Sequence, residues 1–552
     1  MLLFIWVLTG CLIPNVWLSL TERMSLIQSA ANIILPSGIY LLLLSLSRKI
    51  GRTSLWMIIL FFFAAFQIVL LYMYGRSVIA VDMFLNVVTT NPGEVGELLG
   101  NLSIIILAVI CIYIPPIILG ITAAIKRWRI SRLMQKRTRT AGILAAAAGL
   151  VCFGGSFLSA RPYNPVCDLY PANVLYNLYL AVQRTVKVAG YDSSSAGYKY
   201  DAYSSRPDSI PEIYVIMIGE TSRADNWQIA GYDRPTTPRL MDMEGLASFR
   251  RTISQSNTTH KSVPMLLSPL DASNFGDSIY NVKSLITAFK EAGYATAFFS
   301  AQSRNHSFID FFGEEADTCV FIKEQKGKKA NYYDTDLLPY LDRAMASGHN
   351  KQLIVLHCYG SHFNYIDRYP KANARFLPDH PAMATHHYRD KQINAYDNTI
   401  LFTSDLIADI IGRLKSCGKT AGLIYTSDHG EDIFDDDRRL FLHASPIPSY
   451  YQLHVPFLIW LSDEYDSHYP TKRGILKSNS GKYVASSRAF FHSVVDMAGI
   501  ATPRLHKEYS VLDSTYTPGE KLYLNDHNKA VPLMECGILE QDIKKFGELD
   551  IR

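Results

Sequence analysis

The stretch 256–264, with the sequence SNTTHKSVP, places two threonine hydroxyls and a histidine beside a signal for the start of a helix. Ser262 is a favourable N-cap residue, and Pro264 suits a first helical turn. Thr258 and Thr259 are therefore predicted to lie just before a helix. Backbone N–H groups and the helix dipole favour a bound anion such as phosphate there. A capped surface helix without chemistry is the alternative that this stretch alone leaves open.

From residue 213 onward, short apolar runs alternate with helical segments, which is typical of an α/β sheet covered by helices. The predicted strands are 213–220, 295–301, 351–359, 421–428 and 455–463. In such folds ligands gather at the carboxyl ends of the strands. The side chains that follow these strands are therefore the candidates for a functional site.

Carboxylates and histidines follow three of these strands. The set comprises Glu220, His357, His362, Asp428, His429 and the later loop residue His443. Any one of these histidines is also compatible with a hydrogen-bonded core role, but together the residues predict a zinc site for hydrolysis or group transfer. The nearby run 435–437, three aspartates, is predicted to be a solvated loop and not a metal ligand.

Cysteine is not expected to contribute to this metal site. The eight cysteines show no CxxC pair and no zinc-finger spacing. Any metal must therefore be held by His, Asp, Glu or a hydroxyl. The spacing leaves a disulfide among the five later cysteines open and does not identify its pair.

Charge divides the chain into two parts. Residues 1–160 carry 12 Lys and Arg against 4 Asp and Glu, a net charge of +8, whereas the remainder carries 42 against 46, a net charge of −4. The second part shows no basic stripe interleaved with aromatic residues, so nucleic acid is not expected as a partner. The basic excess of the first part indicates a membrane.

Five apolar stretches lie in that first part, at about 2–20, 30–46, 55–74, 102–124 and 141–160. Most are close to the ~20 residues that cross a bilayer, so five transmembrane helices are predicted. The connectors 48–52 and 126–139 are strongly basic and should lie inside, which places everything after the fifth helix outside. Leu8–Cys11 also resembles a lipoprotein cleavage box, but no basic segment precedes it and the apolar run continues to Leu20.

The outer loop 81–100 is more polar than a plain connector. Asn86, Thr90 and Glu94 recur at a helical spacing and would present a polar stripe that could hold an ammonium or a head group. A solvated loop is the alternative. Further along, 170–188 suits an amphipathic helix at the bilayer surface. The predicted domains are a transmembrane domain, 1–160, an interfacial helix and linker, 161–211, and a catalytic domain, 212–552.

Five blocks stand in one order along the second part: GETSRADNWQIAGYDRPTTP (219–238), TTHKSVP, LHCYGSH, YDNTI and SDHGE. With these blocks the chain resembles, over nearly its whole length, the phosphoethanolamine transferases of Gram-negative bacteria, in the alkaline phosphatase/sulfatase superfamily. The resemblance implies a five-helix transmembrane domain and a sulfatase-like α/β sandwich with a central, mostly parallel sheet. It also implies a multi-pass protein of the inner membrane with its catalytic domain in the periplasm.

The resemblance assigns roles to particular residues. Thr259 matches the nucleophile, with Thr221 and Thr258 as the local alternatives. The implied zinc ligands are Glu220, Thr259, Asp428 and His429. The residues implied in binding substrate are Asn86, Thr90, Glu94, Ser303, His306, His357, His362 and His443. His362 and His443 also match histidines tied to the phosphate, a second metal or the leaving group. Relatives bracket the nucleophile with a disulfide, whereas this chain has Ser254-Gln255-Ser256 and Met265 there.

The implied reaction has two steps. Thr259 would attack phosphatidylethanolamine and release diacylglycerol, and a lipid A phosphate or another envelope glycan would then take the phosphoethanolamine. His362 or His443 would protonate the leaving group or activate the acceptor. A glycerol-phosphate polymerase or a phosphatase of the same superfamily is the nearest alternative, and a membrane sensor without catalysis is a further one. A sulfatase is disfavoured because no C/S-x-P-x-R context surrounds Thr259.

Overall fold

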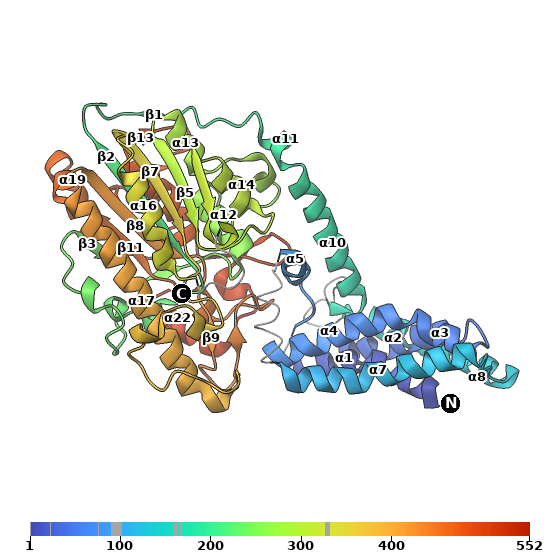
Figure 1. The fold of residues 1–552 in the computed structure, drawn as a ribbon. Helices are drawn as coiled ribbons and strands as arrows, with labels where there is room; N and C mark the ends of the chain where they lie inside the picture. The colour runs from blue at the N-terminus through green and yellow to red at the C-terminus, as the bar shows by residue number, and fades with distance from the viewer. Residues whose placement is uncertain are drawn as a thin grey trace. The chain divides into compact units, whose positions relative to one another are not determined.

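The computed structural model describes residues 2–22, 24–75, 77–89, 102–158, 164, 168–325 and 332–551. The chain divides into two compact units, Met1–Arg184 and Thr185–Arg552 (Figure 1). The first unit is helical, and the second contains the sheet. The boundaries predicted at residues 160 and 211 remain predictions.

The first unit contains the predicted membrane spans. Four helices are long and apolar enough to cross a membrane: α1 (Leu2–Thr21), α2 (Leu26–Leu44), α7 (Ser103–Ile125) and α8 (Arg132–Ser156). Two more, α3 (Ile50–Trp56) and α4 (Ile58–Tyr74), meet at a bend of 46° and together make a fifth candidate. The described residues thus hold four spans, or five with the bent pair. The helix α8 begins nine residues before its predicted apolar stretch and includes much of the basic connector.

Small residues explain the close packing of α2 against α8. A Cβ built on Gly38 would lie 2.3 Å from the backbone nitrogen of Ala146, and one on Gly149 would lie 2.5 Å from Cα of Leu35. The two backbones could not approach in this way with larger side chains. Membrane helices use small residues to this end, because packing drives their association once water is absent.

Three further described helices lie in segments that the sequence places outside the membrane spans. Asn86 is half-buried in α5 (Val81–Thr89), whereas Thr90 and Glu94 lie outside the described residues. The predicted amphipathic helix corresponds to α10 (Ala172–Ala189), which is followed by α11 (Tyr191–Ser195). Tyr179, Val182 and Val186 of α10 are exposed, and the place of this helix at the bilayer surface remains a prediction.

A seven-stranded sheet forms the centre of the second unit, in the order β3-β11-β8-β2-β7-β5-β6. The strands are β2 (Glu212–Gly219), β3 (Leu246–Ser248), β5 (Ala295–Ser300), β6 (Thr318–Phe321), β7 (Lys351–His357), β8 (Thr420–Ser427) and β11 (Phe457–Leu461). The five strands from β8 to β6 are parallel, and β11 runs antiparallel to both of its neighbours. The α/β, mostly parallel sheet predicted from the sequence is confirmed. The two edge strands, β3 and β6, are not among the predicted strands.

The register aligns the carboxyl ends of the three central strands. Ile218 of β2 pairs with His357 of β7 on one side and with Thr426 of β8 on the other. The residues that follow β2, β7 and β8 therefore leave the sheet at the same edge. These are the segments in which the sequence places its carboxylates and histidines.

Helices and short strands complete the unit. The helices are α12 (Thr259–Leu267), α13 (Leu285–Glu291), α14 (Phe308–Glu314), α15 (Ile322–Gln325), α16 (Leu338–Met345), α17 (Arg389–Ser416), α18 (Tyr450–Leu453), α19 (Asp463–His468), α20 (Thr471–Asn479), α21 (Ser486–Met497) and α22 (Glu540–Glu548). The two-residue strands are β1 (Tyr203–Ser204), β4 (Thr252–Ile253), β9 (Asp432–Ile433), β10 (Phe441–Leu442), β12 (Val484–Ala485) and β13 (Ile500–Ala501), and the hairpin is β14 (Leu522–Leu524) with β15 (Ala530–Pro532).

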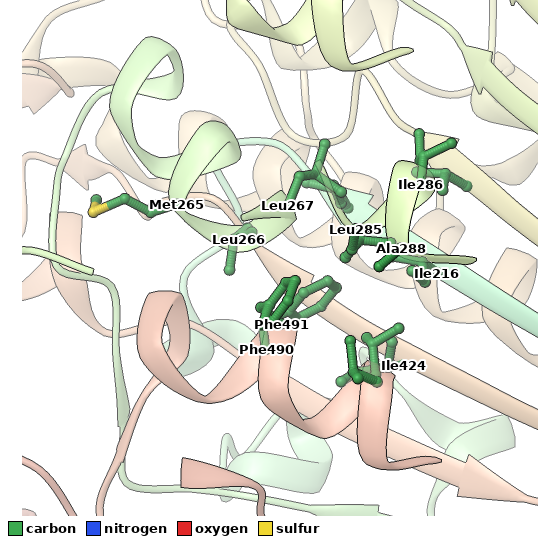
Figure 2. Packing of buried hydrophobic residues seen from close by; sticks show 14 of the residues in the cluster. Ile216, Met265, Leu266, Leu267, Leu285, Ile286, Ala288, Ile424, Phe490 and Phe491 are labelled. Atoms are coloured by element: carbon green, nitrogen blue, oxygen red, sulfur yellow. The ribbon is translucent and has the colours of Figure 1, made fainter. Parts of the chain in front are cut away.

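The core of the second unit anchors α12. Leu266 and Leu267 of this helix are buried in one apolar cluster with Phe490 and Phe491 of α21 and with Ile216 of the sheet (Figure 2). Burying such side chains stabilises the fold by about 1.5–3 kcal/mol each. The last turn of α12 is thus fixed by packing, and its first residue is held at a defined place.

The start of α12 differs from its prediction. The helix begins at Thr259 with Thr258 as N-cap, so Ser262 and Pro264 lie inside it. The backbone N–H of Ser262 already donates to the Thr258 carbonyl at 3.0 Å, and its hydroxyl donates to the Ser256 carbonyl at 3.2 Å. The predicted N-cap is therefore wrong by four residues, because the hydroxyl of Ser262 binds the preceding loop.

Candidate active site

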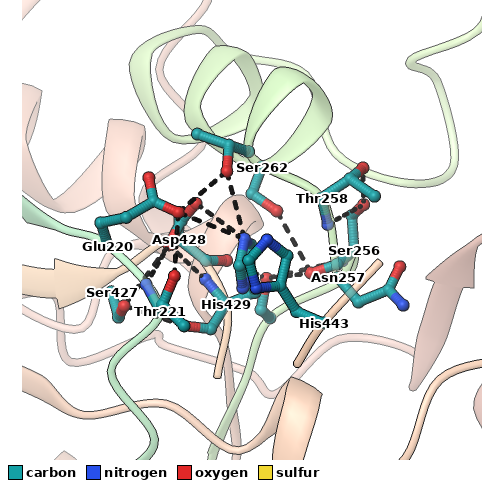
Figure 3. A network of polar contacts seen from close by, with 12 residues as sticks. Glu220, Thr221, Ser256, Asn257, Thr258, Ser262, Ser427, Asp428, His429 and His443 are labelled. Carbon is teal, nitrogen blue, oxygen red and sulfur yellow. Dashed lines mark hydrogen bonds and ion pairs between the residues drawn. The ribbon is translucent and has the colours of Figure 1, made fainter. Parts of the chain in front are cut away.

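The Thr259 hydroxyl lies at the start of α12 among three other predicted zinc ligands. Its Oγ1 is 3.0 Å from Glu220 Oε1 and 3.1 Å from His429 Nε2. His429 Nε2 lies 3.2 Å from Asp428 Oδ2 and 3.5 Å from Glu220 Oε1. Glu220 follows β2, and Asp428 and His429 follow β8, so the strand ends bring them together (Figure 3). The structure thus places all four predicted ligands side by side.

Backbone contacts hold these side chains in place. Asp428 Oδ1 accepts the backbone N–H groups of Thr221 at 3.0 Å and of His429 at 2.7 Å. Thr221 has a φ of +60°, which is unusual for a β-branched residue and is typical of functional sites. A Cβ on Gly360, whose φ is +52°, would lie 2.6 Å from the Glu220 carbonyl oxygen. Only glycine lets the loop after β7 pack this closely on Glu220.

The hydrogen bonds of the histidines define their tautomers. His429 Nδ1 is 2.9 Å from the Gly430 carbonyl, and His362 Nδ1 is 2.7 Å from the Phe363 carbonyl. A carbonyl only accepts, so both Nδ1 atoms carry hydrogen and donate it. Nε2 of each ring is left with its lone pair, which is the form that binds a metal. His443 Nδ1 in turn contacts Glu431 Oε1 at 3.2 Å.

Among the residues that the structure describes, two groups of side chains are candidates to hold a metal ion. The inner group is Glu220, Asp428 and His429, and the outer group is Glu220, His362 and His443, with the ligand atoms of each group within 4.8 Å of one another. Asp428 Oδ2 is buried and has no hydrogen-bond partner. A buried carboxylate oxygen without a donor is costly unless a cation faces it. Carboxylate and imidazole ligands suit zinc, so the inner group fits that ion.

Burial favours the uncharged form of each of these ionisable side chains. It raises the pKa of Glu220 to about 8, with a contribution from the neighbouring Asp428, and it raises the pKa of Asp428 to about 7. Burial lowers the pKa of His429 and of His443 to about 4. The carboxyls therefore retain protons near neutral pH when no cation is present, while both imidazoles stay neutral. A metal ion would displace those protons.

Not every predicted site residue belongs to these groups. His357 is 1% exposed and contacts Ser300 Oγ through Nδ1 at 3.0 Å, outside both groups. Ser303 is half-buried, and His306 is exposed with a φ of +56°. Neither residue is in a candidate metal group, so their roles in binding substrate remain predictions. The same holds for Asn86, and for Thr90 and Glu94 outside the described residues.

Two residues of the site were not predicted from the sequence. Gln302 Nε2 lies 3.2 Å from Glu220 Oε2, and Glu431 contacts His443. The position of each residue in the sequence could have identified it. Gln302 comes two residues after the end of β5, as Glu220 follows β2, and Glu431 belongs to the SDHGE block.

The prediction for the aspartate run 435–437 is wrong in part. Arg223 Nη1 lies 2.6 Å from Asp435 Oδ2, and the two side chains are only 4% and 6% exposed. A buried guanidinium requires a charged partner, which draws Asp435 inward. Arg223 also donates from Nε to Asn226 Oδ1 at 2.6 Å, so the first family block is a buried polar network behind Glu220.

With this geometry in place, the chain can be compared with known proteins. The family model described as Sulfatase matches residues 212–500, which is more than half of the chain. The chain therefore belongs to the sulfatase family. This confirms the resemblance seen in the sequence at the level of the superfamily.

Among curated proteins, the chain is similar to phosphoethanolamine transferases. It is 27% identical over 379 residues to the Kdo(2)-lipid A phosphoethanolamine 7''-transferase of Escherichia coli, covering 67% of this chain and 62% of that protein. It is 28% identical over 328 residues to the phosphoethanolamine transferase EptA of Salmonella typhimurium, covering 56% of each. The chain thus matches less than two thirds of the length of these relatives.

Two solved structures share the fold. The integral membrane lipooligosaccharide phosphoethanolamine transferase A of Neisseria meningitidis superposes with a TM-score of 0.71 at 19% identity, over 92% of this chain and 97% of that one. The periplasmic domain of EcEptC from Escherichia coli, in complex with Zn, gives 0.55 at 22% identity, over 60% and 95%. The combination of a helical membrane region and a sulfatase-like α/β domain is thereby confirmed.

Proposed function

We propose that this protein transfers phosphoethanolamine from phosphatidylethanolamine to a lipid A phosphate or another acceptor of the outer envelope. The observation that carries the proposal is the Thr259 hydroxyl, which lies within 3.1 Å of Glu220 and His429 at the start of α12. The similarity to enzymes named for this transfer supports the choice of group and donor.

Zinc is the proposed cofactor. Glu220, Asp428, His429 and the Thr259 hydroxyl would hold it, and the orphaned Asp428 Oδ2 supports a cation at that place. When bound there, zinc lowers the pKa of a hydroxyl and offsets charge on a phosphoryl group. The crystal of the related EcEptC domain in complex with Zn agrees with this choice.

Thr259 acts as the nucleophile in this proposal. Its Oγ1 forms a bond to phosphorus, and the bond from phosphorus to the diacylglycerol oxygen breaks, which leaves a phosphoethanolamine ester on Thr259. The hydroxyl proton leaves by way of an outer histidine, because Glu220 Oε1, which is 3.0 Å away, is itself a proposed metal ligand. Backbone N–H groups at the start of α12 favour the phosphate at this place.

The two outer histidines carry protons between the halves of the reaction. In the first half the departing diacylglycerol oxygen takes up the proton that Thr259 gave to an outer histidine, and in the second half the acceptor oxygen passes its proton through a histidine back to Thr259 Oγ1 as that oxygen leaves phosphorus. Nε2 of His362 has its lone pair available, because Nδ1 donates to Phe363. His443 lies next to His429, with ring centroids 4.3 Å apart, and is held by Glu431.

The site is proposed to face the periplasm of a Gram-negative cell, with the first unit in the inner membrane. The basic connectors after the second and fourth candidate spans support this orientation. Donor and acceptor are then both components of the envelope, which a membrane-anchored enzyme can reach. The proposed acceptor is the phosphate of lipid A or another envelope glycan.

Expression in a host that makes lipid A tests the function directly. The envelope lipids and glycans should gain one phosphoethanolamine by mass spectrometry, and phosphatidylethanolamine should be converted to diacylglycerol. Cells with the Thr259→Ala variant should lack both changes. Release of free phosphoethanolamine to water would indicate a phosphatase, and consumption of phosphatidylglycerol would indicate a glycerol-phosphate transferase. Either result would overturn the proposal.

A further inference from the structure

The second oxygen of the Glu220 carboxylate contacts a residue that the proposed mechanism does not use. Oε1 faces Thr259, whereas Oε2 lies 3.2 Å from Nε2 of Gln302. Gln302 follows β5, and β7 separates that strand from β2 in the sheet. The side chain of Gln302 therefore reaches across the end of β7 to the carboxylate.

The surroundings fix which end of the Gln302 amide faces Glu220. Nε2 also lies 2.9 Å from the Cys358 carbonyl oxygen. A carbonyl only accepts hydrogen bonds, so Nε2 must face Cys358, and its second N–H group is left for Glu220 Oε2. The reversed amide would set its own oxygen against both acceptors and is excluded.

Gln302 is itself held from behind. Its backbone N–H donates to Ser300 Oγ at 3.1 Å, and Ser300 Oγ contacts His357 Nδ1 at 3.0 Å. His357 Nε2 lies 3.4 Å from the Gln302 amide nitrogen. His357 contacts Gln302 and Ser300. Because it is only 1% exposed, it offers almost no surface to a substrate.

We infer that Gln302 is a positioning residue that fixes the Glu220 carboxylate so that Oε1 alone serves as metal ligand. This inference rests on the proposed function, since Glu220 is a ligand only if the site holds zinc. An amide bound to Oε2 keeps that oxygen away from the ion and stops the carboxylate from rotating. Hydrogen bonds of this kind to metal ligands are worth about 10–100-fold in metal affinity.

The test uses the full chain in detergent and two variants. Gln302→Leu removes the donor, and Gln302→Glu keeps the size but turns an acceptor toward Glu220 and Cys358. Zinc affinity is measured by competition with a chelator, and the geometry at the metal is followed by the visible absorption of the cobalt-substituted protein. Both variants should bind zinc about 10–100-fold more weakly and shift the cobalt bands.

Gln352→Leu is the matched control. Its amide makes comparable hydrogen bonds, at 2.9 Å to the Ala344 carbonyl and 2.8 Å to Ser347 Oγ, but it lies at the amino end of β7. This variant should keep the zinc affinity and cobalt spectrum of the wild type. The thermal melting of the zinc-free proteins reports any general loss of fold.

Two results would overturn the inference. One is wild-type zinc affinity and an unchanged cobalt spectrum in both Gln302 variants. The other is a loss of melting temperature alone, with normal zinc binding by the folded fraction. The proposed function fails separately, because a wild-type protein without zinc binding or transfer would contradict it before any Gln302 variant is compared.

Discussion

The inner and outer metal groups share Glu220 but are built differently. Asp428 and His429 are buried at the end of β8, and backbone N–H groups fix the Asp428 carboxylate. His362 and His443 come from loops after β7 and β10, and the His443 side chain is 18% exposed. A rigid, buried set suits a permanently bound ion, whereas accessible loop residues suit contact with a changing substrate. We therefore propose that the inner group retains the metal and that the outer group transfers protons.

Removal of an inner ligand should have the largest effect. Asp428→Ala should lose bound zinc and lower kcat/KM by about a thousandfold or more, since several kcal/mol of transition-state stabilisation depend on the ion. Metal analysis and lipid turnover measure the two effects. Asp437→Ala, an exposed aspartate of the same region, is the control. Retention of stoichiometric zinc by Asp428→Ala would contradict the role of the inner group.

Removal of an outer histidine should separate activity from metal content. His443→Ala should lower kcat by about a hundredfold, the lower range for loss of a general acid or base, while zinc stays bound at the inner group. His387→Ala removes an exposed histidine and should change neither quantity. Loss of the zinc together with the activity in His443→Ala would show that the two groups do not divide their roles.

A third prediction concerns the network behind Glu220. Asp435→Asn should lower the free energy of unfolding by about 3–5 kcal/mol, because Arg223 is left as a buried charge without its ionic partner. Denaturant unfolding of the zinc-free protein measures the change, with Asp437→Asn as the exposed counterpart. Equal stabilities of the two variants would show that Asp435 is solvated, as the sequence had indicated.

The smallest effect expected is a dependence of stability on pH. The pKa of Asp428, raised to about 7, and that of Glu220, raised to about 8, mean that the metal-free folded protein keeps protons that the unfolded chain has lost above about pH 4. The stability from these protons is present at low pH and is lost as the pH rises through 7 to 8. Zinc needs the same carboxyls deprotonated, so its affinity rises over that interval.

The difference in melting temperature between zinc-loaded and zinc-free protein should therefore widen by a few degrees between about pH 6.5 and about pH 8.5. Thermal melts of both forms across this range measure it. His429 and His443, whose pKa values are lowered to about 4, stay neutral throughout and do not contribute. A difference that is constant or narrows with rising pH would show that the inner carboxyls are already ionised without metal.

The elements of the fold were largely predictable because each is dictated by local pattern. A membrane span must be apolar over about 20 residues, so α1, α2 and α7 follow from composition. The buried parallel strands β2, β7 and β8 are continuous apolar runs, as strands covered on both faces must be. The strand β6 is short, with its first residue exposed, and carries no such signal.

Part of the candidate site was predictable because its residues sit at strand ends, whereas Thr259 came from the helix signal and the family resemblance. Glu220, Asp428 and His429 were identified from the strand ends. The start of α12 was missed because Ser262 bonds to Ser256 instead of capping the helix, a choice made by the packing of a loop. The contacts of Gln302 with Glu220 and of Arg223 with Asp435 join residues 82 and 212 positions apart. No local pattern encodes such contacts.

The central role given to Thr259 is tested most directly by trapping its ester. The purified protein is incubated with labelled phosphatidylethanolamine and no acceptor, then quenched, digested and examined by peptide mass spectrometry. We expect one phosphoethanolamine on Thr259 in the wild type and in Thr258→Ala, which lacks the neighbouring hydroxyl, and none in Thr259→Ala. A labelled peptide from Thr259→Ala, or a label on Thr258 or Thr221 in the wild type, would contradict the role of Thr259.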